Sequence, residues 1–205
     1  SFVVVVGVAA TWADTHRFGI LHVLNWPFWA EALLAVFILD FAVWFQHFAM
    51  HRFAFFWRMH AVHHSDRDLD VTTALRFHPF ELIVSTIYKS AIVVLLGVPV
   101  ILALAFELWL NANALFNHSN IRLPAKIDRM LRVFLITPDV HLVHHSVAVA
   151  EQKSNFGFAL SIWDRLFGTY CAESAVGAEN QIIGLSQFDD RQPASFIWSM
   201  KQPMT

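Results

Sequence analysis

The chain has 205 residues, a length that suits one domain, and its formal net charge of -2 argues against a nucleic-acid partner. Hydrophobic residues make up 57% of it and charged residues only 15%, against about 25% charged residues in soluble domains, so the composition indicates contact with lipid. The single cysteine, Cys171, excludes an internal disulfide and thiolate metal clusters, so any metal must be bound through nitrogen or oxygen.

The N-terminal residues 2–24 are apolar but interrupted by charged side chains. We expect the tail of a membrane helix there, followed by a connecting loop. The chain begins with Ser1 inside an apolar run that no basic segment precedes, which favours an N-terminally truncated domain over a signal peptide. Pro27 then begins an apolar stretch over 28–46, close to the roughly 20 residues that span a bilayer, and its helix is predicted to continue to about Arg52.

Residues 53–64 are aromatic and basic and predict a helix at the membrane interface, and the polar residues 65–80 predict a loop or a short helix. The apolar region 82–116 that follows is too long for one span. Because Gly97 and Pro99 lie near its middle, we favour a hairpin of two helices that turns there over a single kinked helix.

The segments that follow are less apolar. Residues 120–136 mix basic and apolar side chains and predict an amphipathic surface helix. Thr137-Pro138-Asp139 has the N-cap residue, the first-turn proline and the acidic side chain that are typical of a helix start. After residue 150 the sequence is soluble in character, and we expect 173–205 to form a soluble C-terminal tail.

Clustered histidines are the main functional signal. The pattern HxxHH occurs in 60–64 and again in 141–145, and HxxxH occurs in 47–51. Residues three and four apart share one helix face, so each cluster presents its imidazoles in one direction. Neutral imidazole suits iron, copper, zinc and nickel, and these imidazoles exceed the needs of one tetrahedral zinc, so the pattern predicts a site for two metal ions. The eight histidines are His47, His51, His60, His63, His64, His141, His144 and His145.

Charge distribution then predicts the topology. Basic residues gather near both HxxHH motifs, and the positive-inside rule places those segments on the cytoplasmic side. A hairpin over 82–116 returns to the side where it began, so all three clusters can meet. The sequence therefore predicts an all-α integral membrane bundle of about three to four membrane helices. One pair of them is expected to form the hairpin, and a cytoplasmic helical cap is expected to hold a histidine-rich dimetal site.

Taken with their neighbours, these motifs resemble the fatty acid hydroxylase/sterol desaturase superfamily of membrane-bound, histidine-rich di-iron oxygenases. The resemblance covers about residues 28–172, within a single domain over 1–205, and it is closest to the short bacterial sterol desaturase family proteins. The matching stretches are His47 to Arg52, Met59 to Ser65, Thr72 to Glu81, Phe116 to Asn120, Thr137 to Ser146, Asn155 to Gly157 and Trp163 to Tyr170.

The resemblance implies an O2-dependent enzyme that hydroxylates or desaturates an unactivated C–H bond of a lipid, such as a sterol, a fatty acyl chain or an ether lipid. It implies two iron ions, which zinc can replace during expression, and a separate electron donor, either a ferredoxin or a cytochrome b5-like protein with its reductase. It also implies the inner membrane of a bacterium. The eight clustered histidines match family ligands, His118 matches a ninth, and His78 is a further candidate, either as a ligand or as a residue beside the ligands.

Three more side chains are candidates for positions next to the metal. Asp40 lies two helical turns before His47 on the same face and is a candidate to orient a ligand imidazole. Asn117 is a candidate for contact with a metal directly or through water, and Asp139 for orienting a histidine. Glu107, within the hairpin, faces either a substrate cavity or a neighbouring helix.

Other classes of metal protein are alternatives. A non-catalytic protein that binds or transports metal would usually place polar ligands near the bilayer midplane, whereas these clusters lie at helix ends and in interfacial segments. A haem protein needs two axial histidines and leaves most of the clusters unexplained. Among enzymes, carotenoid hydroxylases have related motifs, although residues 72–81 and 163–170 fit the sterol desaturase type better.

Overall fold

The computed structural model describes residues 2–24, 26–188 and 195–204, and within these ranges the chain forms helices and isolated β-bridges but no strand. Three helices are long and apolar enough to cross a membrane: α3 (Phe28–Arg52), α5 (Pro79–Leu96) and α6 (Val100–Asn117). The prediction of an all-α membrane protein is thus confirmed. The other helices are α1 (Phe2–Thr15), α2 (Ile20–Leu24), α4 (Ala54–His64), η1 (Thr73–Leu75), α7 (Ala125–Leu131), α8 (Pro138–His144), α9 (Val149–Gln152), α10 (Ile162–Phe167), α11 (Phe196–Lys201) and η2 (Gln202–Met204).

The predicted hairpin is also confirmed, as α5 and α6 turn at Gly97. Gly97 has φ +69°, a left-handed conformation that favours glycine. A Cβ atom at this position would lie 2.5 Å from the carbonyl oxygen of Phe18, because the α1–α2 connection closes over the turn. The turn therefore needs glycine for two reasons, its backbone conformation and the lack of space.

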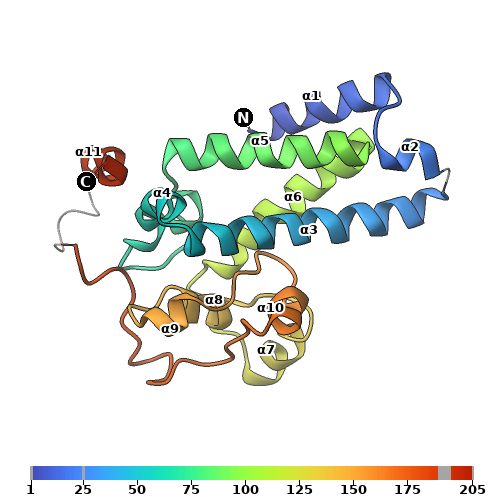
Figure 1. The fold of residues 1–205 in the computed structure, drawn as a ribbon. Coiled ribbons are helices and arrows are strands. Elements are labelled where there is room, and N and C mark those ends of the chain that lie inside the picture. Colours follow the sequence, from blue (N-terminus) through green and yellow to red (C-terminus); the bar gives the residue numbers. More distant parts are fainter. Residues whose placement is uncertain (1, 25, 189–194, 205) are drawn as a thin grey trace.

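An apolar core joins α1, α3, α5 and α6; in Figure 1, α1, α3 and α5 run in nearly the same direction and α6 crosses them obliquely. Leu39 of α3, Val93 of α5 and Phe106 of α6 are buried in it. Large apolar side chains on the outer faces, such as Leu33 and Leu108, are exposed. Burial on one side and exposed apolar side chains on the other suit helices that face lipid.

Two predicted elements differ from the structure. Residues 2–24 form two helices, α1 and α2, instead of the tail of one helix and a loop. The surface helix predicted over 120–136 is limited to α7. It begins after Pro124, which has no N–H to continue a helix before it, and beyond Leu131 the backbone pairs with a distant loop, where the Ile136 N–H donates to the Ala159 carbonyl.

The segments after α6 form a cap that extends along the second half of α3 (Figure 1). The indole N–H of Trp163, on α10, donates to Asp40 at 2.7 Å, and the indole N–H of Trp44 donates to Asp164 at 3.0 Å. Part of the predicted C-terminal tail also packs on this cap, because the Gly184 N–H donates to the His145 carbonyl. The cap thus fixes the end of α3 that carries the first histidine cluster.

Candidate metal centre

All three histidine clusters meet at one end of the spanning helices. The first cluster lies in the last turns of α3, the second lies on α4, and the third lies on and just after α8. His118 caps the C-terminus of α6, which the hairpin brings back to the same end. Four elements, α3, α4, α6 and α8, therefore each supply imidazoles to one region.

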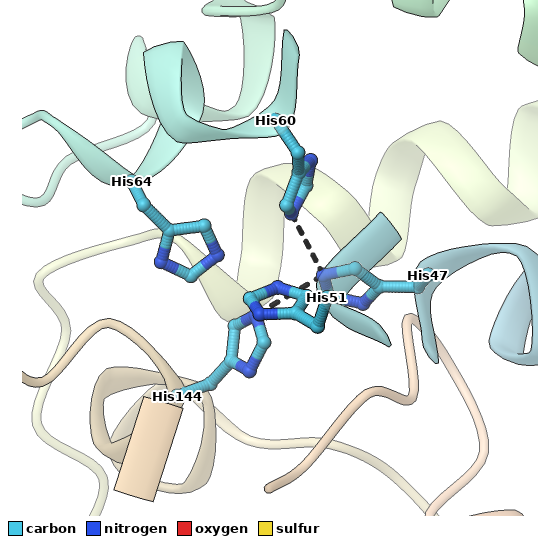
Figure 2. A group of neighbouring side chains, drawn as sticks. All are labelled: His47, His51, His60, His64 and His144. Atoms are coloured by element: carbon cyan, nitrogen blue, oxygen red, sulfur yellow. Dashed lines mark hydrogen bonds between the residues drawn. The ribbon is translucent and has the colours of Figure 1, made fainter. Parts of the chain in front are cut away.

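Nine buried histidines divide into two groups. Within each group, the nitrogen atoms that could bind a metal all lie within 4.8 Å of one another. Figure 2 shows the group of five histidines, whose imidazole rings point toward a common centre. The two groups are adjacent, since the rings of His64 and His145 stack with centroids 4.5 Å apart. The five-histidine group is His47, His51, His60, His64 and His144, and the four-histidine group is His63, His118, His141 and His145.

Hydrogen bonds behind the rings fix the tautomers in the five-histidine group. His47 Nδ1 lies 2.8 Å from the Phe156 carbonyl oxygen, and His144 Nδ1 lies 2.7 Å from that of Ser154. His60 Nδ1 lies 2.7 Å from Glu81 Oε1. Carbonyl and carboxylate oxygens only accept, so each Nδ1 carries the hydrogen and each Nε2 is bare.

The bare nitrogens then face one another. His47 Nε2 lies 3.0 Å from Nε2 of both His60 and His144, the contacts drawn as dashed lines in Figure 2. With no hydrogen on either atom, lone pair faces lone pair, which is unfavourable unless a cation lies between them. Nitrogens that bind one ion at about 2.0–2.1 Å sit about 3 Å apart when they are neighbours around it. The donor set and its spacing therefore fit a metal ion.

The four-histidine group repeats this arrangement. His63 Nδ1 lies 3.1 Å from the Thr73 carbonyl oxygen, and His118 Nδ1 lies 2.7 Å from that of Ala114. Their Nε2 atoms are 3.1 Å apart, and His118 Nε2 is also 3.1 Å from His141 Nε2. The second group thus fits a second metal ion by the same argument.

Burial favours the neutral form of six of these rings. It lowers the pKa of the histidines in the cap well below the usual range, to about 4 for His118 and about 3 for His144, because a buried imidazolium loses its hydration. The neutral ring is the form that binds metal. The same cause lowers the pKa of His63, His64, His141 and His145.

Several ring nitrogens are buried with no hydrogen-bond partner among the described residues. Both nitrogens of His64 are of this kind, as are Nδ1 of His141 and Nδ1 of His145. Buried polar atoms are rarely left unpaired, so each of them is expected to have a partner of another kind. For one of the two His64 nitrogens a bound metal ion would supply that partner.

Three side chains that the sequence analysis did not single out support the ligands. Glu81 holds His60 and keeps its second carboxylate oxygen buried without a partner among the described residues. Asp164 accepts from the backbone N–H groups of Phe156 and Gly157, and thereby fixes the carbonyl behind His47. Asn155 accepts from the Cys171 N–H and donates to the Val140 carbonyl. All three lie in stretches that carry the family resemblance, Glu81 in the His-Pro-x-Glu sequence.

The remaining candidates lie elsewhere. His78 belongs to neither group: it is the N-cap of α5, where its Nδ1 accepts from the Phe80 N–H.

Asp40 accepts from Trp163, so its carboxylate is directed to α10 and not to a histidine. Asn117 donates to the Phe158 carbonyl and has a buried side-chain oxygen with no described partner. Asp139 lies 3.6 Å from the Arg132 guanidinium, and its carboxylate is partly exposed.

A cavity of about 280 Å³ reaches the five-histidine group from the spanning helices. His47, His60 and Glu81 form its metal end. Apolar side chains such as Val43 and Leu110 line it farther from the metal. An elongated apolar molecule can thus approach the centre from within the helical bundle.

Taken together, the fold and the site define a class: membrane proteins with a histidine-rich centre for two metal ions, reached by a cavity between spanning helices. Comparison with known families agrees, because residues 32–169 match the family model described as fatty acid hydroxylase. The chain belongs to the fatty acid hydroxylase family. No solved structure matches it.

Curated relatives are lipid-modifying enzymes by name. Ornithine lipid hydroxylase OlsE of Rhizobium tropici is 33% identical over 154 residues, which cover 71% of this chain and 43% of that protein. Alkylglycerol monooxygenase of Homo sapiens is 27% identical over 180 residues, covering 85% of this chain and 36% of that protein. The chain thus spans less than half the length of these relatives.

Proposed function

We propose that this chain is the metal-binding membrane domain of an O2-dependent di-iron oxygenase that oxidises an unactivated C–H bond of a lipid. The observation that carries the proposal is the pair of histidine groups, whose bare Nε2 atoms face one another at 3.0–3.1 Å at the end of an apolar cavity. In an apolar chain that occupies the cavity, the C–H bonds nearest to the metal centre would lie beside His47 and His60.

Each part of the site has a role in this proposal. Two iron ions, when bound, supply the activation of O2, with two electrons from a separate donor. The nine imidazoles hold the ions without adding negative charge, and the oxygens behind the rings fix their orientation. The carboxylate of Glu81 stabilises the hydrogen on His60 Nδ1 and raises the basicity of that ligand. Apolar side chains in the cavity wall, such as Val43 and Leu110, exclude water from the hydrocarbon chain of the substrate.

Hydroxylation is the reaction we favour over desaturation. It is supported by the names of the relatives, one a hydroxylase of an ornithine lipid and the other a monooxygenase of alkylglycerols. We propose a substrate of the same kind, a polar lipid with a long hydrocarbon chain. Its chain would enter the cavity between α3, α5 and α6.

Charge distribution supports a cytoplasmic metal centre in a bacterial inner membrane. Basic residues such as Arg58, Arg76 and Arg129 lie in or next to the elements at the metal end of the bundle, whereas Arg17 lies near the far end, beside the hairpin turn. On that side a ferredoxin or a cytochrome b5-like protein with its reductase can supply electrons.

Metal content is the first test of this proposal. The detergent-purified chain is expected to hold two irons, or zinc that iron can replace, and the His144→Ala variant is expected to lose metal. With a reductase system and O2, the parent should convert a lipid to a hydroxylated product that incorporates oxygen from labelled O2. Full activity of His144→Ala would contradict the proposal. Metal flux in liposomes would favour a transporter, and a Soret band would favour a haem protein.

A further inference from the structure

The cavity that reaches the metal centre has a second, polar region. Apart from Thr86, whose hydroxyl donates to the Leu82 carbonyl, five polar side chains line it away from the metal: Gln46 of α3, Ser85 and Lys89 of α5, and Glu107 and Asn111 of α6. We name this set the polar pocket. All five lie within helices long and apolar enough to span a membrane, where ionisable side chains are costly and usually mark a functional site.

An ion pair forms the centre of the polar pocket. Lys89 Nζ lies 2.6 Å and 2.8 Å from the two carboxylate oxygens of Glu107, and only 12% and 3% of the two side chains are exposed. A lysine ammonium has three N–H donors, so at least one remains for another acceptor. Around the pair, the Ser85 hydroxyl donates to the side-chain amide oxygen of Gln46 at 3.3 Å, and the Asn111 side chain donates to the Glu107 backbone carbonyl at 2.7 Å.

Joining α5 to α6 does not account for the whole arrangement. A bond that only held two helices together would be best placed in the packed interface, sealed from the cavity. Here Lys89 and Glu107 both face the cavity, and Gln46 from a third helix faces it with them. A purely apolar lipid chain in contact with these groups would leave their remaining donors and acceptors, such as the third N–H of Lys89, without partners, which costs free energy.

We propose that the polar pocket binds an uncharged hydrogen-bonding group of the lipid substrate that has both a donor and an acceptor, such as a hydroxyl or an amide. The pair carries no net charge, so it favours a neutral group that can both accept from Lys89 and donate to Glu107 or Asn111. This inference rests on the proposed function for the identity of the ligand as substrate, while the binding itself does not depend on turnover.

The pocket also sets a distance from the polar group to the oxidised carbon. Glu81, at the metal end of the cavity, and Lys89 lie on the same face of α5, eight residues apart. At 1.5 Å per residue the separation is about 12 Å. A substrate held at Lys89 would therefore present a carbon several bonds away from its polar group to the metal.

Binding of a matched pair of lipids tests this inference. Tritiated hexadecan-1-ol and tritiated hexadecane differ by one hydroxyl group, and the purified chain in detergent is expected to bind the alcohol more tightly. In the double variant Lys89→Leu/Glu107→Leu, which removes both charges together, affinity for the alcohol should fall about ten-fold or more, whereas affinity for the alkane should not fall. Equal affinities in the parent, or an unchanged ratio in the variant, would overturn the inference.

If the double variant does not fold, a single substitution with a closely matched control still tests the inference. Asn111 and Asn113 each donate to the carbonyl four residues earlier on α6, but only Asn111 lines the cavity. Asn111→Leu should weaken binding of hexadecan-1-ol, and Asn113→Leu should not. If both variants bind the alcohol as the parent does, the pocket is not a lipid site. Selective binding without turnover of any lipid would contradict the proposed function and leave the pocket standing.

Discussion

At the scale of single residues, an oxygen behind a ligand imidazole determines which of its two ring nitrogens can bind metal. Five of the nine histidines have Nδ1 within hydrogen-bond distance of a carbonyl or carboxylate oxygen, which leaves Nε2 for a metal. Spacing on a helix could predict which rings share a face. It could not predict the oxygens, because these come from loops and helices elsewhere in the sequence.

His118 and His78 give the clearest contrast between a ligand and a histidine with another role. His118 is one of four imidazoles in its group, whereas His78 caps a helix. We expect His118→Ala to lose one of the two bound irons, because only three of the four imidazoles remain to hold that ion. His78→Ala should keep both irons. Elemental analysis of the purified variants checks this, and equal metal content in the two would contradict it.

Glu81 is expected to control how tightly metal is bound. Its carboxylate makes His60 a more basic ligand, and replacing such partners typically lowers metal affinity by about 10-fold to 100-fold. Glu81→Gln keeps an acceptor for His60 but removes the charge, so we expect a loss of about ten-fold, measured by competition with a chelator. Glu31→Gln, a carboxylate in the first turn of α3 at the opposite end of the bundle, is the control, and its affinity should match the parent.

Among the elements, the α5–α6 hairpin decides whether the site can form, because it returns His118 to the end where α5 began. Length and the Gly-Val-Pro sequence were sufficient to predict this turn. The surface helix over 120–136 was predicted too long, since the pairing of residues near Ile136 with the loop near Ala159 depends on a contact between distant segments.

Two glycines with nearly the same backbone conformation test the hairpin turn. Gly97 has φ +69° and Gly168 has φ +71°, so alanine costs about 1–2 kcal/mol at either position from conformation alone. At Gly97 a Cβ would also meet the Phe18 carbonyl at 2.5 Å, whereas at Gly168 it would meet nothing within 4 Å. Gly97→Ala should therefore lower the melting temperature in detergent more than Gly168→Ala. Equal shifts would mean that the Phe18 carbonyl can move away from a Cβ at position 97 without lowering stability.

For the whole molecule, the histidine pattern and composition were enough to predict a membrane bundle with a two-metal centre, but not the way the cap is held. The indole of Trp44 and the carboxylate of Asp164 are 120 positions apart in sequence, and no local signal joins them. Among the described residues, the Asp164 carboxylate accepts from four donors, the others being the Phe156 and Gly157 N–H groups and the Thr169 hydroxyl. Such contacts follow from the packed fold, in which α3 and α10 meet.

The C-terminal segment provides the last test, because it closes the cap from outside. Ile182 accepts from the Val147 N–H, the Gly184 N–H donates to the His145 carbonyl, and Leu185 is buried. A chain that ends at residue 180 loses these contacts beside the third histidine cluster, and we expect it to bind less metal and to unfold at a lower temperature. A chain that ends at residue 195 keeps them and loses α11 and η2, so its metal content should stay close to that of the parent. If the shorter chain also binds both ions fully, residues 181–188 have no part in holding the metal centre.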